Sequence, residues 1–393
     1  MDIPSRVTDK GVSLMHIYKL GNIADKKAAL KELGVESGGV SIMAKKMELF
    51  HFFIKDLKTP AANILKQDAL SIGADLAVPG GVILCEKPTY DCILIGSKKH
   101  MEILSKKELG QPFGLKTIAN ELKKFLSLKT FPVQIMGIIN ANDDSFFKGS
   151  RFMAEDAITQ IEKMIHDGAN IIDVGAVSSR PGAELVSEGE ELKRIKPVCD
   201  MIKEKSLNEK ATFSIDSYTS SVVEYALSSG FEIVNDITGA SDENIIKLAV
   251  KYDAKICIMH MQRTPQTMQE DPRYNDVMVE VSEFFEERIA KCEKLGLMRE
   301  NIILDVGIGF GKTLEHNLVL IKNLNHFKHF GCELLIGASR KSMIDKIVSS
   351  SIEERLPGTL AIHLKAVENG TSIVRCHDVV EHKQAFAVFN KLS

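Results

Sequence analysis

The chain has 393 residues, 44% of them hydrophobic and 26% charged, with a formal net charge of -3. These values are typical of globular proteins with large cores and exclude disordered and fibrous classes. At about 100 to 200 residues per domain, the length predicts two or three domains. No apolar run approaches the roughly 18 residues that a membrane-crossing helix needs, and the charged start MDIPSRVTDK does not resemble a signal peptide. We therefore expect a cytoplasmic protein without membrane contact.

Charge and cysteine patterns divide the chain and limit its partners. Residues 1–130 carry 20 Lys and Arg against 14 Asp and Glu, whereas residues 131–393 carry 30 against 39, which predicts a domain boundary near residue 130. The lysines of the front part are scattered and have few aromatic neighbours, so nucleic-acid binding is not expected. The seven cysteines form no C-x-x-C pair, and their odd number favours reduced, structural thiols over a disulfide framework.

The front part, residues 1–130, reads as a small α/β or α+β accessory domain. The runs HFFIKDL (51–57), GGVIL (80–84) and DCILIGS (91–97) predict strands, and helical spacing covers residues 59–73 and 115–128. We find no catalytic motif there, and the role of this domain stays open.

From residue 131 onward, short apolar runs alternate with amphipathic helical segments, several of which end at a glycine. The predicted strands number eight: 133–139, 170–175, 212–217, 232–237, 255–260, 301–306, 333–338 and 372–378. Strands that are continuous Val, Ile and Leu runs are typical of parallel sheets buried on both faces. Eight such units in 263 residues predict a (β/α)8 TIM barrel, with a doubly wound open sheet as the alternative.

Polar side chains stand at the carboxyl ends of these predicted strands, where the loops of a barrel build its active site. They are Asn140, Asp173, Asp216, Asn235, Asp236, His260, Asp305, Ser339, Arg375 and His377. Any one of them could simply cap the following helix, but their presence on all eight strands favours a site.

Two carboxylates and an amide form the first candidate group: Asp216, Asn235 and Asp305. Buried acids need hydrogen-bond donors, because an unpaired buried charge is costly. A heterocycle with an aminopyrimidinone edge, such as a pterin or guanine, supplies several N–H donors in one plane. Binding of a divalent metal by the same carboxylates is the competing interpretation.

A positive group follows strands two, seven and eight: Arg180, Arg340, Lys341, Arg375 and His377. The loops after strands seven and eight of such barrels often bind phosphate, so this group predicts an anion-binding rim. The alternative is that Arg340 and Lys341 only begin a surface helix.

Two motifs near strand six have weaker interpretations. The segment GIGFGKT (307–313) is not a phosphate-binding P-loop, because Val306 stands where that pattern requires glycine. Its glycines predict a tight loop that leaves Phe310 and Lys312 facing a planar ligand. His260 lacks a second His or Cys at ligand spacing, so a packed strand-end histidine is favoured over a metal ligand.

Eight segments of residues 131–393 together resemble the dihydropteroate synthase family, in the same order: IMGIINANDDSF, DVGAVSSRPGA, SIDS, IVNDITG, MHMQRTPQTMQ, ILDVGIGFGK, LIGASRKSM and IVRCHDV. The resemblance implies a (β/α)8 barrel that joins p-aminobenzoate to the pyrophosphate ester of 6-hydroxymethyl-7,8-dihydropterin. The products would be 7,8-dihydropteroate and pyrophosphate, in folate biosynthesis and with Mg2+. It also implies a homodimer, and the front domain resembles the extension of some long bacterial forms.

The same resemblance assigns site residues. The pterin pocket would hold Asp216, Asn235, Asp305 and Lys341, and the pyrophosphate and Mg2+ site would hold Asn140, Arg375 and His377, with Asn140 on the metal. Arg180 belongs to the second loop, and the p-aminobenzoate positions are Ser179, Pro181, Phe310 and Ser342, with Ser339 beside them. The chain departs from the usual family pattern at five positions: Asn142, Asp143, Val177, Ser179 and Val306.

The expected chemistry is an SN1-like displacement in which Asn140, Asp216, Lys341, Arg375 and His377 act on the reacting groups. Two alternatives share the pterin-binding barrel. A corrinoid-linked methyltransferase would not need the anion site of residues 339–341, Arg375 and His377. A non-catalytic pterin-binding homologue would have lost it.

Overall fold

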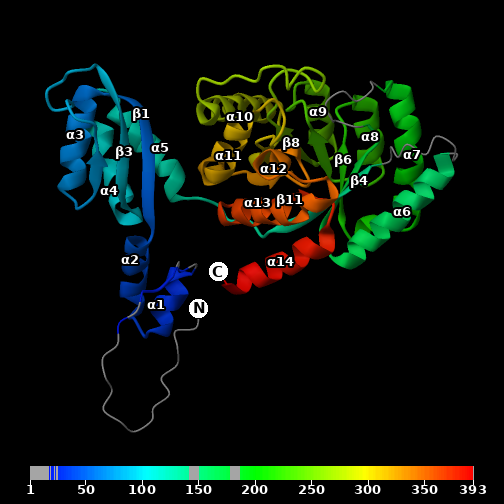
Figure 1. Ribbon diagram of the computed structural model, residues 1–393, viewed down its shortest axis with the longest axis horizontal. Coiled ribbons are helices and arrows are strands. Elements are labelled where there is room, and N and C mark those ends of the chain that lie inside the picture. The colour runs from blue at the N-terminus through cyan, green and yellow to red at the C-terminus, as the bar shows by residue number, and fades with distance from the viewer. Residues whose placement is uncertain are drawn as a thin grey trace, which may run out of the picture. The chain divides into compact units, whose positions relative to one another are not determined.

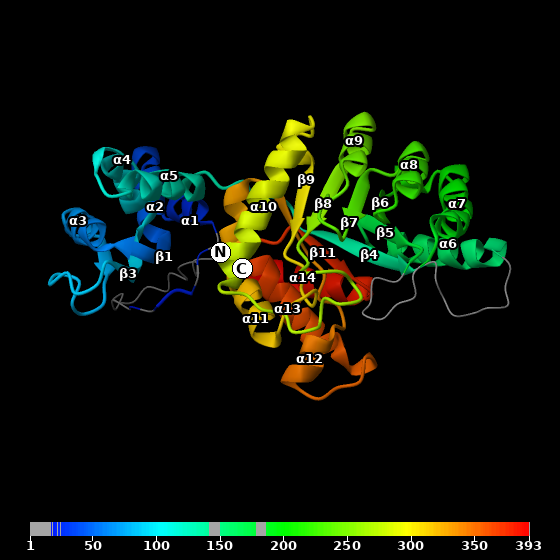
Figure 2. The same ribbon diagram turned by 90° about the horizontal axis from the view of Figure 1, so that it is seen from above.

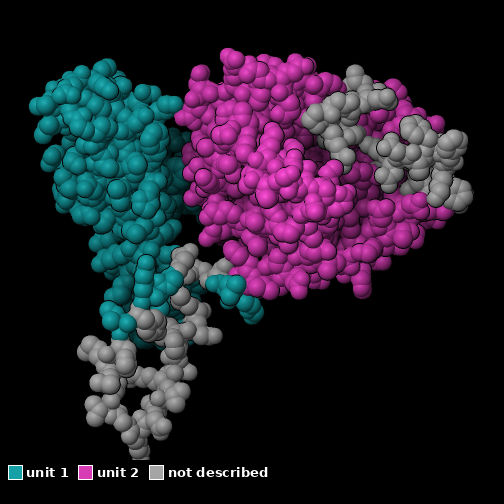
Figure 3. All heavy atoms as spheres, viewed as in Figure 1, with its two compact units in different colours: residues 1–128, 391–393 teal, residues 129–390 magenta. Residues whose placement is uncertain are grey.

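The computed structural model describes residues 25–140, 150–177 and 186–392, together with Ile17, residues 19–21 and Ile23. The chain divides into two compact units, residues 1–128 with 391–393 and residues 129–390, which Figure 3 shows in different colours. Each unit has its own hydrophobic core.

The first unit is an antiparallel three-stranded sheet with helices, an α+β arrangement (Figure 1). Its strands, in the order β1-β3-β2, are β1 (Leu49–Lys58), β2 (Asp75–Ala77) and β3 (Thr89–Ser97). Its helices are α1 (Lys26–Glu32), α2 (Ser37–Met47), α3 (Thr59–Leu70), α4 (Lys98–Lys107) and α5 (Leu115–Leu126). Alternate side chains of β3, among them Cys92 and Leu94, are buried in one cluster with Leu65 of α3 and Leu104 of α4. The helices therefore cover one face of the sheet, as the strand period of two requires.

The predicted strand GGVIL (80–84) is wrong. Residues 80–85 form turns, Gly81 has a φ of +86°, and Ile83 and Leu84 are 81% and 72% exposed, so only Val82 of this run is buried. The third strand is instead the short DLA segment of β2, whose single buried side chain is Leu76. A strand of three residues carries too little alternation to be read from the sequence.

The second unit is a closed barrel of eight parallel strands in chain order (Figure 2). The strands are β4 (Gln134–Asn140), β5 (Ile171–Gly175), β6 (Thr212–Asp216), β7 (Ile233–Asp236), β8 (Lys255–Met259), β9 (Ile302–Asp305), β10 (Glu333–Ile336) and β11 (Ile373–Cys376). All eight predicted strands are confirmed. The pairing of Ile373 with Gln134 joins the last strand to the first, so the alternative of an open sheet is wrong.

Helices alternate with these strands and cover the outside of the barrel. They are α6 (Ser150–Asp167), α7 (Glu188–Glu204), α8 (Ser220–Ser228), α9 (Glu243–Lys251), α10 (Val277–Lys294), α11 (Leu314–Lys322), α12 (Ser342–Ile347), α13 (Leu356–Glu368) and α14 (Val379–Leu392). Acidic N-caps start several of them: Asp242 accepts the Asn244 N–H, and Asp276 accepts those of Met278 and Val279.

The strand period of two places the candidate site inside one mouth of the barrel. Seven buried apolar side chains form a separate cluster, one from each strand except β6: Met136, Ile171, Ile233, Cys257, Ile303, Leu335 and Ile373. Two positions further along four of these strands stand Asp173, Asn235, Asp305 and Arg375. An apolar layer therefore supports a polar layer at the carboxyl ends of the strands, where barrel enzymes place their chemistry.

Among the described residues, none of the helices is long and apolar enough to cross a bilayer. All seven cysteines are free thiols, and six of them are buried, which confirms the expectation of reduced thiols.

Candidate active site

One wall of the barrel mouth is acidic and is made by three neighbouring strands. Asp216 ends β6 and pairs in register with Asn235 of β7. The Nδ2 atom of Asn235 donates a hydrogen bond of 3.0 Å to Oδ2 of Asp173 on β5. Asp173 and Asn235 face inward because each stands two positions after an inward-facing residue of its strand, Ile171 and Ile233 respectively. The structure thus brings together Asp216 and Asn235, and it adds Asp173, which sequence reasoning had left among strand-end polar residues.

Arg375 of β11 faces this wall and carries the positive charge that it requires. Its Nε and Nη2 atoms lie 2.6 Å from Oδ2 of Asp173 and from Oδ2 of Asp216, respectively. Burial lowers the pKa of the guanidinium, but the two carboxylates outweigh burial and raise it, so Arg375 is permanently charged. The predicted anion-binding arginine therefore lies beside the predicted pterin-binding carboxylate.

Burial and two neighbouring charges act on the pKa of the Asp216 carboxyl. Burial raises the pKa of its carboxyl to about 7, the Arg375 guanidinium opposes this, and the Asp173 carboxylate adds to it. The Asp305 carboxyl shows the same direction: burial raises its pKa, and Lys341 opposes. Burial and the neighbouring cations thus act on the pKa of both acids in opposite directions, and a ligand that donates N–H groups would favour their ionised forms.

The loops after β9 and β10 form the second wall. Asp305 accepts the N–H of Gly307 at 2.8 Å, and the Nζ atom of Lys341 donates to the Ile308 carbonyl. The same Nζ lies 4.3 Å from the centre of the half-buried Phe310 ring, a cation–π contact. Burial lowers the pKa of Lys341 to about 8, while Asp305 opposes that shift. Lys341, Asp305 and Phe310 thus lie together, as the sequence predicts.

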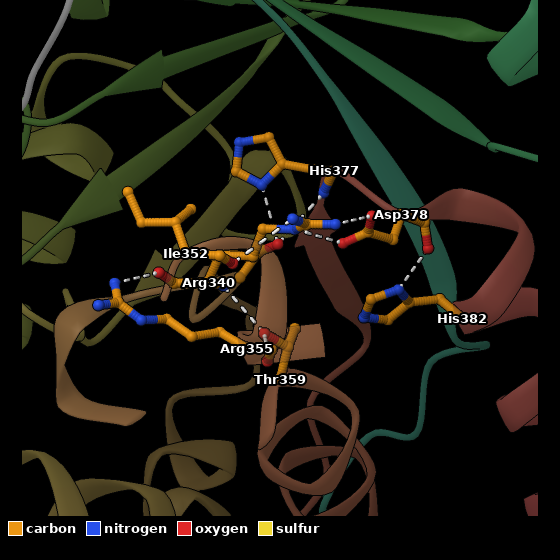
Figure 4. A network of polar contacts seen from close by, with 8 residues as sticks. Arg340, Ile352, Arg355, Thr359, His377, Asp378 and His382 are labelled. Atoms are coloured by element: carbon orange, nitrogen blue, oxygen red, sulfur yellow. Dashed lines mark hydrogen bonds and ion pairs between the residues drawn. The ribbon is translucent and has the colours of Figure 1, made fainter. Parts of the chain in front are cut away.

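A polar network ties the β10 loop to the β11 loop (Figure 4). The Ser339 hydroxyl lies 2.9 Å from Nδ1 of His377 and accepts the backbone N–H of His377 at 3.3 Å. Arg340 donates through Nε and Nη2 to the two carboxylate oxygens of Asp378, at 3.0 and 2.6 Å. The structure therefore gives Arg340 a different role from the one expected in the anion rim, because its fork is already engaged by Asp378 and it holds the two loops together.

Lys312 is buried, so the expectation that it faces a ligand is wrong. Its Nζ atom lies 2.9 Å from Nδ1 of His260 and donates to the carbonyls of His260 and Phe310 at 3.1 and 2.9 Å. His260 is itself only 6% exposed and stacks edge-on against Phe284 at 4.9 Å. The favoured interpretation of His260 as a packed strand-end histidine agrees with this environment.

The remaining assigned residues lie at the rim or outside the described part of the chain. Asn140 is exposed at the end of β4 and pairs in register with Gly175, which in turn pairs with Asp216. Ser342 is exposed and begins α12. Ser179, Arg180 and Pro181, and with them Asn142 and Asp143, lie outside the described residues. Of the five departures from the family pattern, the structure describes the half-buried Val177 and the buried Val306.

Comparison with known proteins identifies the family of the chain. Residues 136–377 match the family model of pterin binding enzymes. A bifunctional dihydropteroate synthase/dihydropteroate reductase of Helicobacter pylori is 41% identical over 367 residues, which is 93% of this chain and 96% of that protein. The chain belongs to the dihydropteroate synthase family.

Several other family members match about two thirds of the chain. The dihydropteroate synthase of Escherichia coli is 42% identical over 255 residues, 65% of this chain and 89% of its own. A Yersinia pestis dihydropteroate synthase crystallised with a sulfonamide drug complex is 34% identical, with a TM-score of 0.62 over 66% of this chain and 94% of its own. One from Clostridium difficile, crystallised with pteroic acid, is 38% identical with a TM-score of 0.61 over 66% of this chain and 97% of its own.

These similarities confirm the resemblance seen in the sequence, the TIM barrel and the transferase activity. The relatives are synthases rather than corrinoid methyltransferases or non-catalytic homologues, so both alternatives are set aside.

Proposed function

We propose that this chain joins p-aminobenzoate to 6-hydroxymethyl-7,8-dihydropterin pyrophosphate by a dissociative, SN1-like substitution. The observation that carries the proposal is the side-by-side placement of acids and cations at one barrel mouth. Asp216 and Asp305 would accept the N–H groups of the dihydropterin ring, and Arg375 and His377 would face its pyrophosphate. The C–O bond to the pyrophosphate breaks, and the arylamine nitrogen then bonds to the methylene carbon and releases a proton.

The nucleophile needs little help from the protein. An arylamine is neutral at pH 7 and carries its lone pair without prior deprotonation, so no strong general base is required. The barrier lies in the departure of pyrophosphate and in the positive charge that develops on the methylene and the ring. Carboxylates fixed in a poorly solvated mouth stabilise that charge without having to reorganise. Asp216 and Asp305 occupy such positions.

The leaving group requires positive charge, and we propose that Mg2+ contributes part of it. Among the described residues, no three His, Cys, Asp or Glu side chains form a metal cage. Asn140 offers one exposed amide oxygen at the end of β4. One protein oxygen suits Mg2+, which usually keeps several waters and binds mainly through substrate phosphates. Bound there, the ion would neutralise the departing pyrophosphate, and Asn140 would orient it while Arg375 and His377 contact the remaining oxygens.

We place p-aminobenzoate against the second wall. Phe310 provides a flat apolar surface whose other contact is the Lys341 ammonium. Ser339 follows in the β10 loop and Ser342 begins α12, and Ser179, Arg180 and Pro181 of the second loop would complete this pocket. The arylamine then approaches the methylene from the side away from the pyrophosphate.

The test is release of pyrophosphate that depends on both substrates. We expect release only when p-aminobenzoate and the pterin pyrophosphate are present together. Removing free Mg2+ with a chelator should suppress it, and readdition should restore it. Release without p-aminobenzoate would contradict the synthase reaction. Full activity after chelation would contradict the metal but leave the substitution in place.

We propose a second activity for the chain, reduction of dihydropteroate. The Escherichia coli synthase matches 65% of the chain, whereas the bifunctional Helicobacter pylori protein, named also as a dihydropteroate reductase, matches 93%. The additional match falls on the first unit, which therefore becomes the candidate for the reductase. Reduction adds a hydride to carbon 6 and a proton to nitrogen 5 of the pterin, so it consumes a dihydronicotinamide or a reduced flavin. Oxidation of that donor dependent on dihydropteroate, with the tetrahydro product identified by mass, is the test.

We further propose that the enzyme works as a homodimer in the cytoplasm. Ile347, Val348 and Ile352, between β10 and α13, are more than half exposed and offer an apolar surface for a second copy. The free thiols fit a reducing compartment. Sedimentation equilibrium of the purified chain tests the dimer, and a monomer at micromolar concentration would contradict it.

A further inference from the structure

Arg375 reaches across the barrel mouth to strands that do not neighbour its own. It lies on β11, and its guanidinium passes β4 to contact Asp173 on β5 and Asp216 on β6, both at 2.6 Å. Its side chain is 22% exposed, against 13% for Asp216 and none for Asp173. One arginine therefore covers the acidic wall that the proposed function gives to the pterin ring.

A guanidinium and a dihydropterin ring place similar demands on Asp216. Each is a flat group of N–H donors around conjugated carbon, and each satisfies a carboxylate by donating in its own plane. Asn235 does not supply Asp216 with another donor, because its amide nitrogen donates to Asp173 instead. A ring that donates to Oδ2 of Asp216, the oxygen that Arg375 contacts, must therefore displace Nη2 of Arg375.

The two forms of the pterin offer Arg375 different compensation. The 6-hydroxymethyl alcohol is uncharged, so the guanidinium would leave a carboxylate and receive no anion in exchange. The pyrophosphate ester carries several negative charges, and arginine binds phosphate oxygens through two parallel N–H groups. In a poorly solvated mouth this difference in charge is worth more than in water. Only the ester therefore supplies both a donor for Asp216 and an anion for Arg375.

Asp173 is placed to hold Arg375 during this exchange. Its Oδ2 atom accepts both Nε of Arg375 and Nδ2 of Asn235, at 2.6 and 3.0 Å. Nε lies at the base of the guanidinium and Nη2 at its tip, so rotation about the Nε contact can move the tip off Asp216 without losing Asp173.

We propose that Arg375 and the pterin ring compete for Asp216, and that the pyrophosphate tail resolves the competition by drawing the guanidinium away, with Asp173 as its pivot. This inference rests on the proposed binding of the pterin at Asp216. The Asp216–Arg375 ion pair then determines specificity, because it weakens binding of the alcohol and leaves binding of the activated ester favourable.

Calorimetry with two ligands tests the competition, because the proposal predicts that one substitution changes the affinities for the two ligands in opposite directions. The full chain, Arg375→Gln and the control Arg299→Gln are titrated at pH 8.5 with 6-hydroxymethyl-7,8-dihydropterin and with its pyrophosphate ester. Arg299 is a matched control because it pairs with Glu293 next to the amino end of β9. We expect Arg375→Gln to bind the alcohol about fivefold more tightly and the ester at least about tenfold more weakly. Arg299→Gln should change neither affinity.

Two further measurements separate the possible failures. If Asp216→Asn binds the alcohol as tightly as the parent, the pterin assignment itself is wrong. If Asp216→Asn loses the alcohol but Arg375→Gln gains nothing for it, only the competition is wrong. Should Arg375→Gln fail to fold, crystal structures of the parent with and without the ester decide: Nη2 of Arg375 still bonded to Asp216 beside the bound ring would overturn the proposal.

Discussion

The two units bury acidic side chains in different ways. In the barrel, Asp173 and Asp216 are buried against the Arg375 guanidinium, which opposes the effect of burial on Asp216. In the first unit, Glu108 is fully buried, and burial followed by the neighbouring Asp68 carboxylate raises its pKa to about 7. An acid held beside a cation can exchange that cation for a ligand, whereas an acid buried beside a second acid only adds a cost to folding. Substitutions at Asp216, Asp236 and Glu108 test this difference.

Replacing Asp216 by Asn should have the largest effect. The amide keeps the shape of the side chain but removes the charge that accepts the pterin N–H groups and stabilises the cationic methylene. Losing one such charged partner costs about 3 kcal/mol, so we expect kcat/KM to fall by about two orders of magnitude. Pyrophosphate release dependent on p-aminobenzoate measures it.

Asp236 provides the control for Asp216, because it is a buried acid of the next strand with a purely internal role. It accepts the N–H and hydroxyl of Thr238 and the N–H of Ala240 at 2.7 to 3.0 Å. We expect Asp236→Asn to lower the thermal midpoint while the folded fraction keeps its KM for the pterin ester. A similar loss of kcat/KM in both variants would show that any buried acid of this mouth matters equally.

The pH profile should report Lys341. Burial lowers its pKa to about 8, so its side chain is charged below that pH and neutral above it. If the charge supports binding at the second wall, kcat/KM falls above pH 8, by about tenfold per unit of pH at the limit. The Lys341→Arg variant stays charged, and its profile should therefore be flat from pH 8 to 9.5. The same alkaline decline in parent and variant would assign the titration to another group.

Breaking the clamp between the β10 and β11 loops should have a smaller effect on turnover. Arg340→Gln removes both hydrogen bonds to Asp378, which lie at a mostly buried position. We expect a loss of about 2 kcal/mol in stability and about a fivefold lower kcat, since Ser339 and His377 lose their fixed separation. Unfolding in urea and steady-state kinetics measure the two effects. A double-mutant cycle with Asp378→Asn should show that the two changes are not additive.

The sequence predicts the barrel well and its charge pairing poorly, for a physical reason. Each strand is a continuous apolar run ending in a polar residue, so the eight strands and the location of Asp216, Asn235 and Asp305 at their ends follow from local pattern. Which cation meets which acid depends on contacts between distant parts of the chain: Arg375 lies 159 residues from Asp216 and 202 residues from Asp173. Local pattern carries no information on such a pair, so the sequence alone assigns Asp173 no role in the site.

The same limit explains the assignments that changed. Arg340 and Lys341 are adjacent in sequence and look alike as cations of one loop. One bonds to Asp378 behind the site, and the other lies over Phe310. In the first unit, β2 is too short to show alternation, and the apolar run of residues 82–84 lies in a turn because Gly81 adopts a left-handed conformation.

The smallest effect on activity is expected at Glu108. Its pKa is raised to about 7 from an ordinary value of 4.5. The contribution of the protonated Glu108 carboxyl to the stability of the first unit is therefore fully present at pH 4.5 and below and is lost as pH rises through 7. Glu108→Gln cannot ionise and should remove this loss. At pH 8.5 we expect the variant to be about 2 kcal/mol more stable than the parent, and at pH 5 to be equal to it within about 0.5 kcal/mol.

Amide hydrogen exchange in α3 and α5 measures this locally, without assuming that the two units unfold together. Synthase turnover should stay unchanged at both pH values, because Glu108 belongs to the first unit and the residues that act on substrate belong to the barrel. A variant less stable than the parent at pH 8.5 would mean that the Glu108 carboxylate is held by a partner in the way that Asp216 is held by Arg375. The distinction between the acids of the two units would then fail.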